Sequence, residues 1–214
     1  MTIYGRHAVS GRWTLVWLIA FGLVLVWSGI QPHDYPTWAL EVAPAVAALV
    51  ALAATRRRFP LTPLVYWLVL AHAVILMVGG HYTYAEVPAG EWLSDAFGGD
   101  RNNYDKLGHF AQGFVPALVA REILVRLEVV RGRAWLAFVV ACICLAVSAF
   151  YELVEWWVAL LSEEAAESFL GTQGYAWDTQ SDMLFALLGV IAALLLLSRA
   201  HDRQIAALSR GKTG

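Results

Sequence analysis

The sequence has little charge for its length, and its basic residues are not gathered on one surface. Asp, Glu, Lys and Arg make up 15% of the 214 residues, whereas apolar residues make up 59%. That apolar share exceeds what a soluble domain of this length needs. The net charge of -2 and the scattered basic residues provide no broad positive surface, so we expect no nucleic-acid partner. The composition predicts a single membrane domain.

Motifs that identify many soluble enzymes are missing as well. There is no Gly-rich phosphate loop beside a strand, no Ser-His-Asp set with persuasive spacing and no cysteine-based metal motif. Cys142 and Cys144 are two residues apart, so on a helix they point to different sides and cannot bridge each other. No small-x-small cleavage site follows the first apolar run, which we therefore keep as a membrane span.

Six apolar runs are long enough to cross a bilayer, which takes roughly 20 helical residues. They cover residues 13–30, 38–54, 61–80, 107–127, 134–161 and 182–197. We predict an all-α, polytopic bundle in which residues 1–198 form one transmembrane domain and residues 199–214 form a polar cytoplasmic tail. Two loops on the outer side, 82–104 and 162–177, are long enough to cover a site.

The distribution of basic residues sets the orientation of this bundle. With the N-terminus in the cytoplasm, 13 of the 15 basic residues lie inside and only Arg101 and Lys106 lie outside. This is a strong positive-inside bias, so both termini are predicted to be cytoplasmic. We interpret the Arg121-Glu122 pair as interfacial, with a snorkelling arginine, and we expect Pro116 to kink its helix and open a cavity.

Ionisable residues recur in pairs at the outer ends of the last three predicted spans. Each pair is separated by three or four residues, so its members share one face of a helix. The pairs are Asp105 and His109, Glu152 and Glu155, and Asp178 and Asp182. Charges inside a membrane are costly, and acids found there are functional candidates by default.

Five carboxylates close together cannot all stay ionised without compensation. Either some of them are protonated or a bound cation neutralises them, and an oxygen-rich site with one imidazole suits a divalent ion such as Mg, Mn, Fe or Zn. We predict a metal site from Asp105, His109, Glu152, Glu155, Asp178 and Asp182. The alternatives are helix N-caps for Asp105 and Asp178, an interfacial position for Glu155, and plain surface positions for the rest. For His72 we expect a hydrogen bond to a backbone carbonyl rather than a ligand role.

Three ordered segments carry a resemblance to a known family. They are 105–110 (DKLGHF), 151–156 (YELVEW) and 171–183 (GTQGYAWDTQSDM), and together they resemble the YjdF family of bacterial inner-membrane proteins. The resemblance implies a multi-span protein of the bacterial inner membrane with acids on its last three helices, and it brings no settled activity. The first segment and the later aspartate are also similar to the more distant VanZ-like family, which is associated with resistance to glycopeptide antibiotics acting at the envelope.

The preferred functional hypothesis is a metal-dependent membrane hydrolase or transferase that acts on a lipid-linked or envelope substrate near the outer leaflet. The ion is expected on Glu152, Asp182 and His109, with the other acids completing or flanking the site, and Glu155 is the expected general base. Two alternatives stay open. The same acids also suit an ion- or proton-coupled transporter, although no matching acids are evident in the inner half, and a metal-stabilised scaffold needs no turnover.

Overall fold

The computed structural model describes residues 11–97, 101–161 and 173–210, and the described chain is helical with no strand. The long helices are α1 (Gly11–Ser28), α2 (Tyr35–Thr55), α3 (Pro63–Tyr82), α5 (Tyr104–Arg126), α6 (Arg133–Leu161) and α8 (Asp178–Arg210). The short helices η1 (Tyr84–Glu86) and α4 (Pro88–Phe97) occupy most of the loop predicted over 82–104. The loop predicted over 162–177 lies outside the described residues as far as residue 172.

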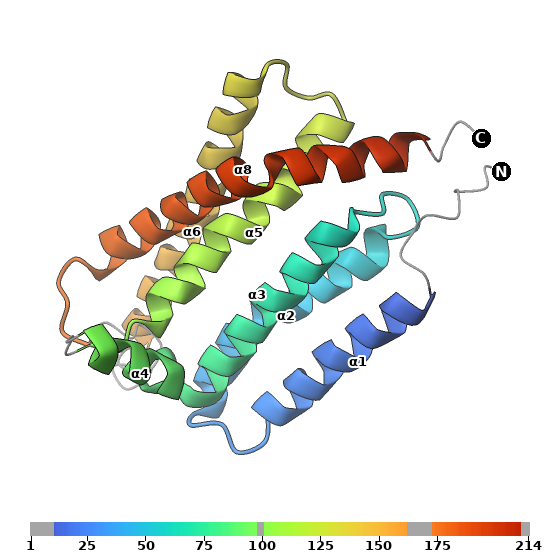
Figure 1. Ribbon diagram of the computed structural model, residues 1–214. Helices are drawn as coiled ribbons and strands as arrows, with labels where there is room; N and C mark the ends of the chain where they lie inside the picture. Colours follow the sequence, from blue (N-terminus) through green and yellow to red (C-terminus); the bar gives the residue numbers. More distant parts are fainter. Residues whose placement is uncertain (1–10, 98–100, 162–172, 211–214) are drawn as a thin grey trace.

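Five of the long helices are long and apolar enough to cross a membrane, and α5 differs from them in polarity. It has 23 residues, five of them charged, yet at about 1.5 Å per residue it also spans the hydrocarbon core. Its charged side chains are tolerated because α5 lies inside the bundle, packed against α3, α6 and α8 (Figure 1). The structure therefore agrees with a polytopic helical membrane protein.

The last helix extends further than its apolar run. We expected a polar tail from residue 199, but α8 continues to Arg210. His201 and Ile205 are buried against the bundle, so this segment has a face that packs against the other helices. Which side of the membrane it faces stays a prediction, although the start of α1 and the end of α8 do lie at the same end of the bundle (Figure 1).

Helices α5 and α8 run in the same direction through the bundle, and their backbones approach each other unusually closely where they cross. A Cβ atom built on Gly113 would lie 1.8 Å from the carbonyl oxygen of Ala186, and one on Gly189 would lie 2.1 Å from that of Phe110. Small residues at such crossings let helix backbones approach within membranes. The crossing brings together the N-terminal ends of α5 and α8, which we predict to face outward and call the outer ends. The functional candidates of both helices lie there.

Candidate functional site

The six predicted site residues are buried and come together at the outer end of three helices. Helix α5 provides Asp105 and His109, α6 provides Glu152 and Glu155, and α8 provides Asp178 and Asp182. Asp105 and Asp178 stand in the first turns of their helices, as expected. Asp178 forms an ion pair with Lys106 across the contact between α5 and α8, whereas Asp105 pairs with Lys106 on its own helix. Whether any of these residues binds a metal stays a prediction.

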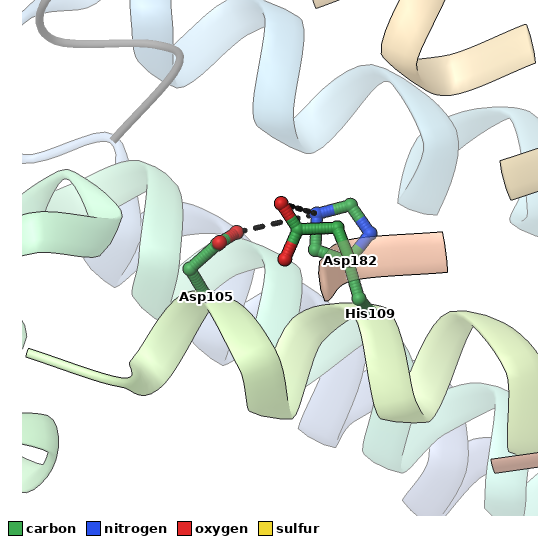
Figure 2. Close-up of side chains that lie close together, drawn as sticks. All are labelled: Asp105, His109 and Asp182. Carbon is green, nitrogen blue, oxygen red and sulfur yellow. Dashed lines mark ion pairs between the residues drawn. The ribbon is translucent and has the colours of Figure 1, made fainter. Parts of the chain in front are cut away.

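His109 lies at the centre of this cluster, between carboxylates on both sides of its ring. On one side its Nε2 atom is 3.3 Å from Asp105 Oδ1 and 3.9 Å from Asp182 Oδ2 (Figure 2). Asp105 and His109 are one turn apart on α5, whereas Asp182 reaches the ring from α8. On the other side, His109 Nδ1 is 3.8 Å from Glu152 Oε1 and 3.2 Å from Gln112 Oε1.

Lys106 compensates much of the aspartate charge. Its Nζ atom is 2.8 Å from Asp178 Oδ1 and 3.3 Å from Asp105 Oδ2, and it also contacts Asp182 Oδ1. Arg101 adds a second cation, 2.5 Å from Asp178 Oδ1. The aspartates on α5 and α8 thus have cationic partners from the protein, so their burial does not require a metal ion.

The two glutamates of α6 have no such compensation. Among the described residues, no lysine or arginine pairs with Glu152 or Glu155. Glu152 Oε1 is buried and has no hydrogen-bond partner in the described part of the chain, and a buried carboxylate oxygen in this condition is costly. His109, Glu152 and Glu155 each offer a ligand atom, and these atoms lie within 4.8 Å of one another. Asp105, His109 and Asp182 meet the same criterion, but Lys106 lies beside two of them.

Sequence reasoning missed Glu41 on α2. Its side chain is 3% exposed and accepts a hydrogen bond from Tyr151 Oη at 3.2 Å. Tyr84 lies beside it with its ring between two glycines, where a Cβ atom on Gly79 or Gly108 would approach the ring to 2.5 or 2.8 Å. A single acid within an otherwise apolar predicted span was the signal that could have identified Glu41.

A cavity of about 450 Å³ opens from this cluster into the bundle. Its polar lining includes Glu41, Asp105, His109 and Glu155, and its remaining walls are mostly apolar. Pro116 lies within α5 and contributes to the lining, while the kink that we expected at this residue stays a prediction. His72 also lines the cavity. Its buried Nε2 has no hydrogen-bond partner among the described residues, so this nitrogen does not make the backbone hydrogen bond that we expected of His72.

A second polar cluster occupies the opposite end of the bundle, where we expected only an interfacial pair. Glu122 is fully buried. It accepts hydrogen bonds from Thr62 N and Oγ1, from His201 Nε2 and from Arg126 Nη1 at 2.7 to 3.1 Å. Arg121 is buried too, and pairs with Asp202 at 2.6 Å. The interfacial interpretation of Arg121 and Glu122 is therefore wrong, because tertiary contacts bury both side chains.

These features define a multi-span helical membrane protein with a buried carboxylate and histidine cluster at one end. The chain belongs to the family described as predicted membrane proteins and designated DUF2238, whose profile matches residues 13–203. It is 57% identical over 183 residues to the inner membrane protein YjdF of Escherichia coli strain K12, covering 86% of this chain and 88% of that relative. No solved structure matches the chain. The resemblance to the YjdF family is confirmed, and the chain is a multi-pass protein of the bacterial inner membrane.

Proposed function

We propose that this protein is a metal-dependent membrane hydrolase or transferase whose divalent ion binds between His109, Glu152 and Glu155. The observation that carries the proposal is the unpartnered Glu152 Oε1, which is buried 3.8 Å from His109 Nδ1. Two ligands that each lie about 2.0–2.2 Å from one ion are separated by at most about 4.4 Å. A divalent ion (Zn, Mn, Fe or Mg) would supply the positive charge that these two glutamates lack.

The two sides of the imidazole have different roles in this proposal. One nitrogen binds one ion, and Lys106 already provides a positive charge on the Nε2 side, so Nδ1 is the better ligand. Asp105 then accepts from Nε2 and orients the ring, as carboxylates do for metal-bound histidines. Gln112 is 3.2 Å from Nδ1 and has to turn its amide when an ion binds.

This ligand set changes the role that the sequence suggested for Glu155. As a ligand, Glu155 is not free to act as the general base, and we assign that role to Glu41. Glu41 lines the cavity together with His109 and Glu155, and the Tyr151 hydroxyl holds its carboxylate in place. A bound ion would activate a water molecule or polarise a phosphoryl or carbonyl oxygen of a lipid or envelope substrate, and Glu41 would accept the proton that the attacking water or hydroxyl group loses.

Elemental analysis tests the metal site directly. The protein is purified in mild detergent, incubated with each divalent ion and desalted. We expect about one ion per chain in the wild type, loss of that ion in Glu152→Gln, and full retention in Asp178→Asn, because Asp178 pairs with Lys106. Glu41→Gln should keep the ion. The proposal fails if the wild type retains no ion, or if Asp178→Asn loses as much as Glu152→Gln.

Ion- or proton-coupled transport is the second candidate, and the inner cluster favours it. A buried acid and histidine, Glu122 and His201, lie at the opposite end of the bundle from His109, which supplies the inner-half set that the sequence did not reveal. However, from Val115 to Ile123 the cavity lining contributed by α5 is apolar. An apolar stretch of this length is a poor path for a proton or an ion, so we rank transport second.

A further inference from the structure

We propose that the cavity holds the hydrocarbon chain of a single-chain amphiphile, which enters from the bilayer between α2 and α6 with its polar group at His109 and Glu41. The inference rests on the proposed function for the chemistry at the polar end and names the substrate class of that site. Binding of the chain itself depends only on the cavity.

The length and lining of the cavity suit a chain that lies along the bundle. On α5 its lining runs from Asp105 to Ile123, which are 18 residues apart, or about 27 Å at about 1.5 Å per residue. Polar side chains lie at the outer end of this stretch. From Val115 inward the α5 lining is apolar, and Ala48 on α2 and Val69 on α3 continue the apolar wall. A ligand that fits has one polar end and a long apolar remainder.

The volume favours one chain over two. Because a water molecule takes up about 30 Å³ in the liquid, the cavity of about 450 Å³ has room for roughly 15 groups of that size. A methylene group is of similar size, so this space corresponds to a single long acyl or similar hydrocarbon chain. A lipid with two such chains needs about twice as much space.

The arrangement of the helices provides a lateral opening. Helices α2 and α6 both line the cavity, but within the described chain they do not pack against each other along their lengths. On α6, Ile143 and Val147 line the cavity and remain 37% and 43% exposed. Because these accessible side chains are apolar, a hydrocarbon chain passes along this side of α6 without crossing a polar surface.

Photolabelling in membranes tests the inference with a matched pair of variants. The full chain is reconstituted in phosphatidylethanolamine and phosphatidylglycerol vesicles with a C16 lysophospholipid that carries a diazirine on its tail. We expect saturable labelling of the α2 and α5 segments that line the cavity, competed by unlabelled lysophospholipid although the diacyl lipids of the vesicle are present in excess. Ala48→Trp fills the cavity and should lower this labelling at least tenfold. Ala47→Trp is the control, because Ala47 is the exposed neighbour on α2 and does not line the cavity.

A second variant guards against misfolding of Ala48→Trp. Val147→Trp closes the opening from a position that already tolerates exposure, and it should slow labelling at least tenfold while its thermal unfolding stays at the wild-type temperature. Equal labelling in Ala47→Trp and Ala48→Trp, or labelling that unlabelled lysophospholipid does not compete, overturns the inference. The ion content of the same samples separates the two proposals. Labelling without a bound ion contradicts the metal site alone, and a bound ion without saturable labelling contradicts the chain site alone.

Discussion

The two ends of the bundle each bury a polar cluster, and the clusters differ in how completely their hydrogen bonds are satisfied. At the inner end Glu122 accepts from a backbone amide, a hydroxyl, a histidine and an arginine. At the outer end Glu152 leaves one buried oxygen without a partner. A fully satisfied buried network makes a fold rigid and specific, whereas an unsatisfied group needs another explanation.

The clusters also differ in whether they contact other helices or line the cavity. Glu122 binds Thr62, just before α3, and His201 on α8, so it joins three parts of the bundle and does not line the large cavity. Asp105, His109, Glu155 and Glu41 do line that cavity. The comparison supports a structural role for the inner cluster and is the basis for our proposal that the outer cluster binds a ligand.

The prediction with the largest expected effect concerns which end of the bundle faces the outside of the cell. Reporter fusions after Arg58, Arg131 and Arg203 should report the cytoplasm, and a fusion after Gly98 should report the external side, because the basic residues are so unequally divided. Alkaline phosphatase and fluorescent-protein fusions at the same positions give opposite signals and control for expression. A cytoplasmic signal at Gly98 would reverse the two ends and place the acid-rich cluster on the inner face.

Removing the Glu122 carboxylate should cause the largest loss of stability. Glu122→Ala leaves Arg126 and His201 buried without their partner, and breaking a buried ion pair costs about 3–5 kcal/mol. Unfolding in mild detergent, followed by circular dichroism, measures the change. Glu128→Ala is the control, because Glu128 is an exposed glutamate near the same helix end. A loss below about 1 kcal/mol for Glu122→Ala contradicts the structural role.

A smaller loss should follow when the α5 and α8 crossing is forced apart. Gly113→Ala places a methyl group against the Ala186 backbone, and overpacking of this kind costs about 1–3 kcal/mol. Gly22→Ala on α1 is the matched control, since nothing lies within 4 Å of the added atom. Because His109, the ligand that α5 provides to the proposed ion site, lies one turn from Gly113, Gly113→Ala should also weaken ion binding, whereas Gly22→Ala should not. Equal stability of the two variants would show that the helices separate at no cost.

The helices could be predicted from the sequence because each apolar run ends at charges or turn residues. The start of α6 at Arg133 and the end of α5 at Arg126 lie within one residue of the predicted limits. The end of α8 was missed because the segment after residue 198 is polar on average, although His201 and Ile205 give it a buried face. A hydropathy run does not reveal a face of that kind.

The sequence predicted which six residues come together in the outer cluster, but it did not predict which of them form ion pairs. Spacings of three and four residues place both members of a pair on one helix face, and three helices meet at one end. Which acid pairs with Lys106 depends on the α5 and α8 crossing. Likewise, Thr62 and His201 are 60 and 79 residues from Glu122 along the chain. No local pattern connects residues that far apart, and so the inner cluster was interpreted as an interface.

The smallest change in stability is expected for a substitution of Glu152, an acid that is as conspicuous in the sequence as Glu122. Glu152→Gln keeps the size of the side chain and removes one negative charge from beside Glu155, so repulsion within the cluster falls. The unpartnered Oε1 has no hydrogen bond to lose. In the presence of chelator we expect the free energy of unfolding of Glu152→Gln to stay within about 0.5 kcal/mol of the wild type or to rise, as it does for substitutions outside structural networks.

A structural metal behaves differently, since its binding free energy is part of the folding free energy. Chelation of the wild type would then unfold the bundle. Unfolding curves of both proteins with and without chelator, in one detergent, separate these cases. A loss of more than about 2 kcal/mol in Glu152→Gln would give the outer glutamate the same structural role as Glu122 and remove the distinction between the two ends.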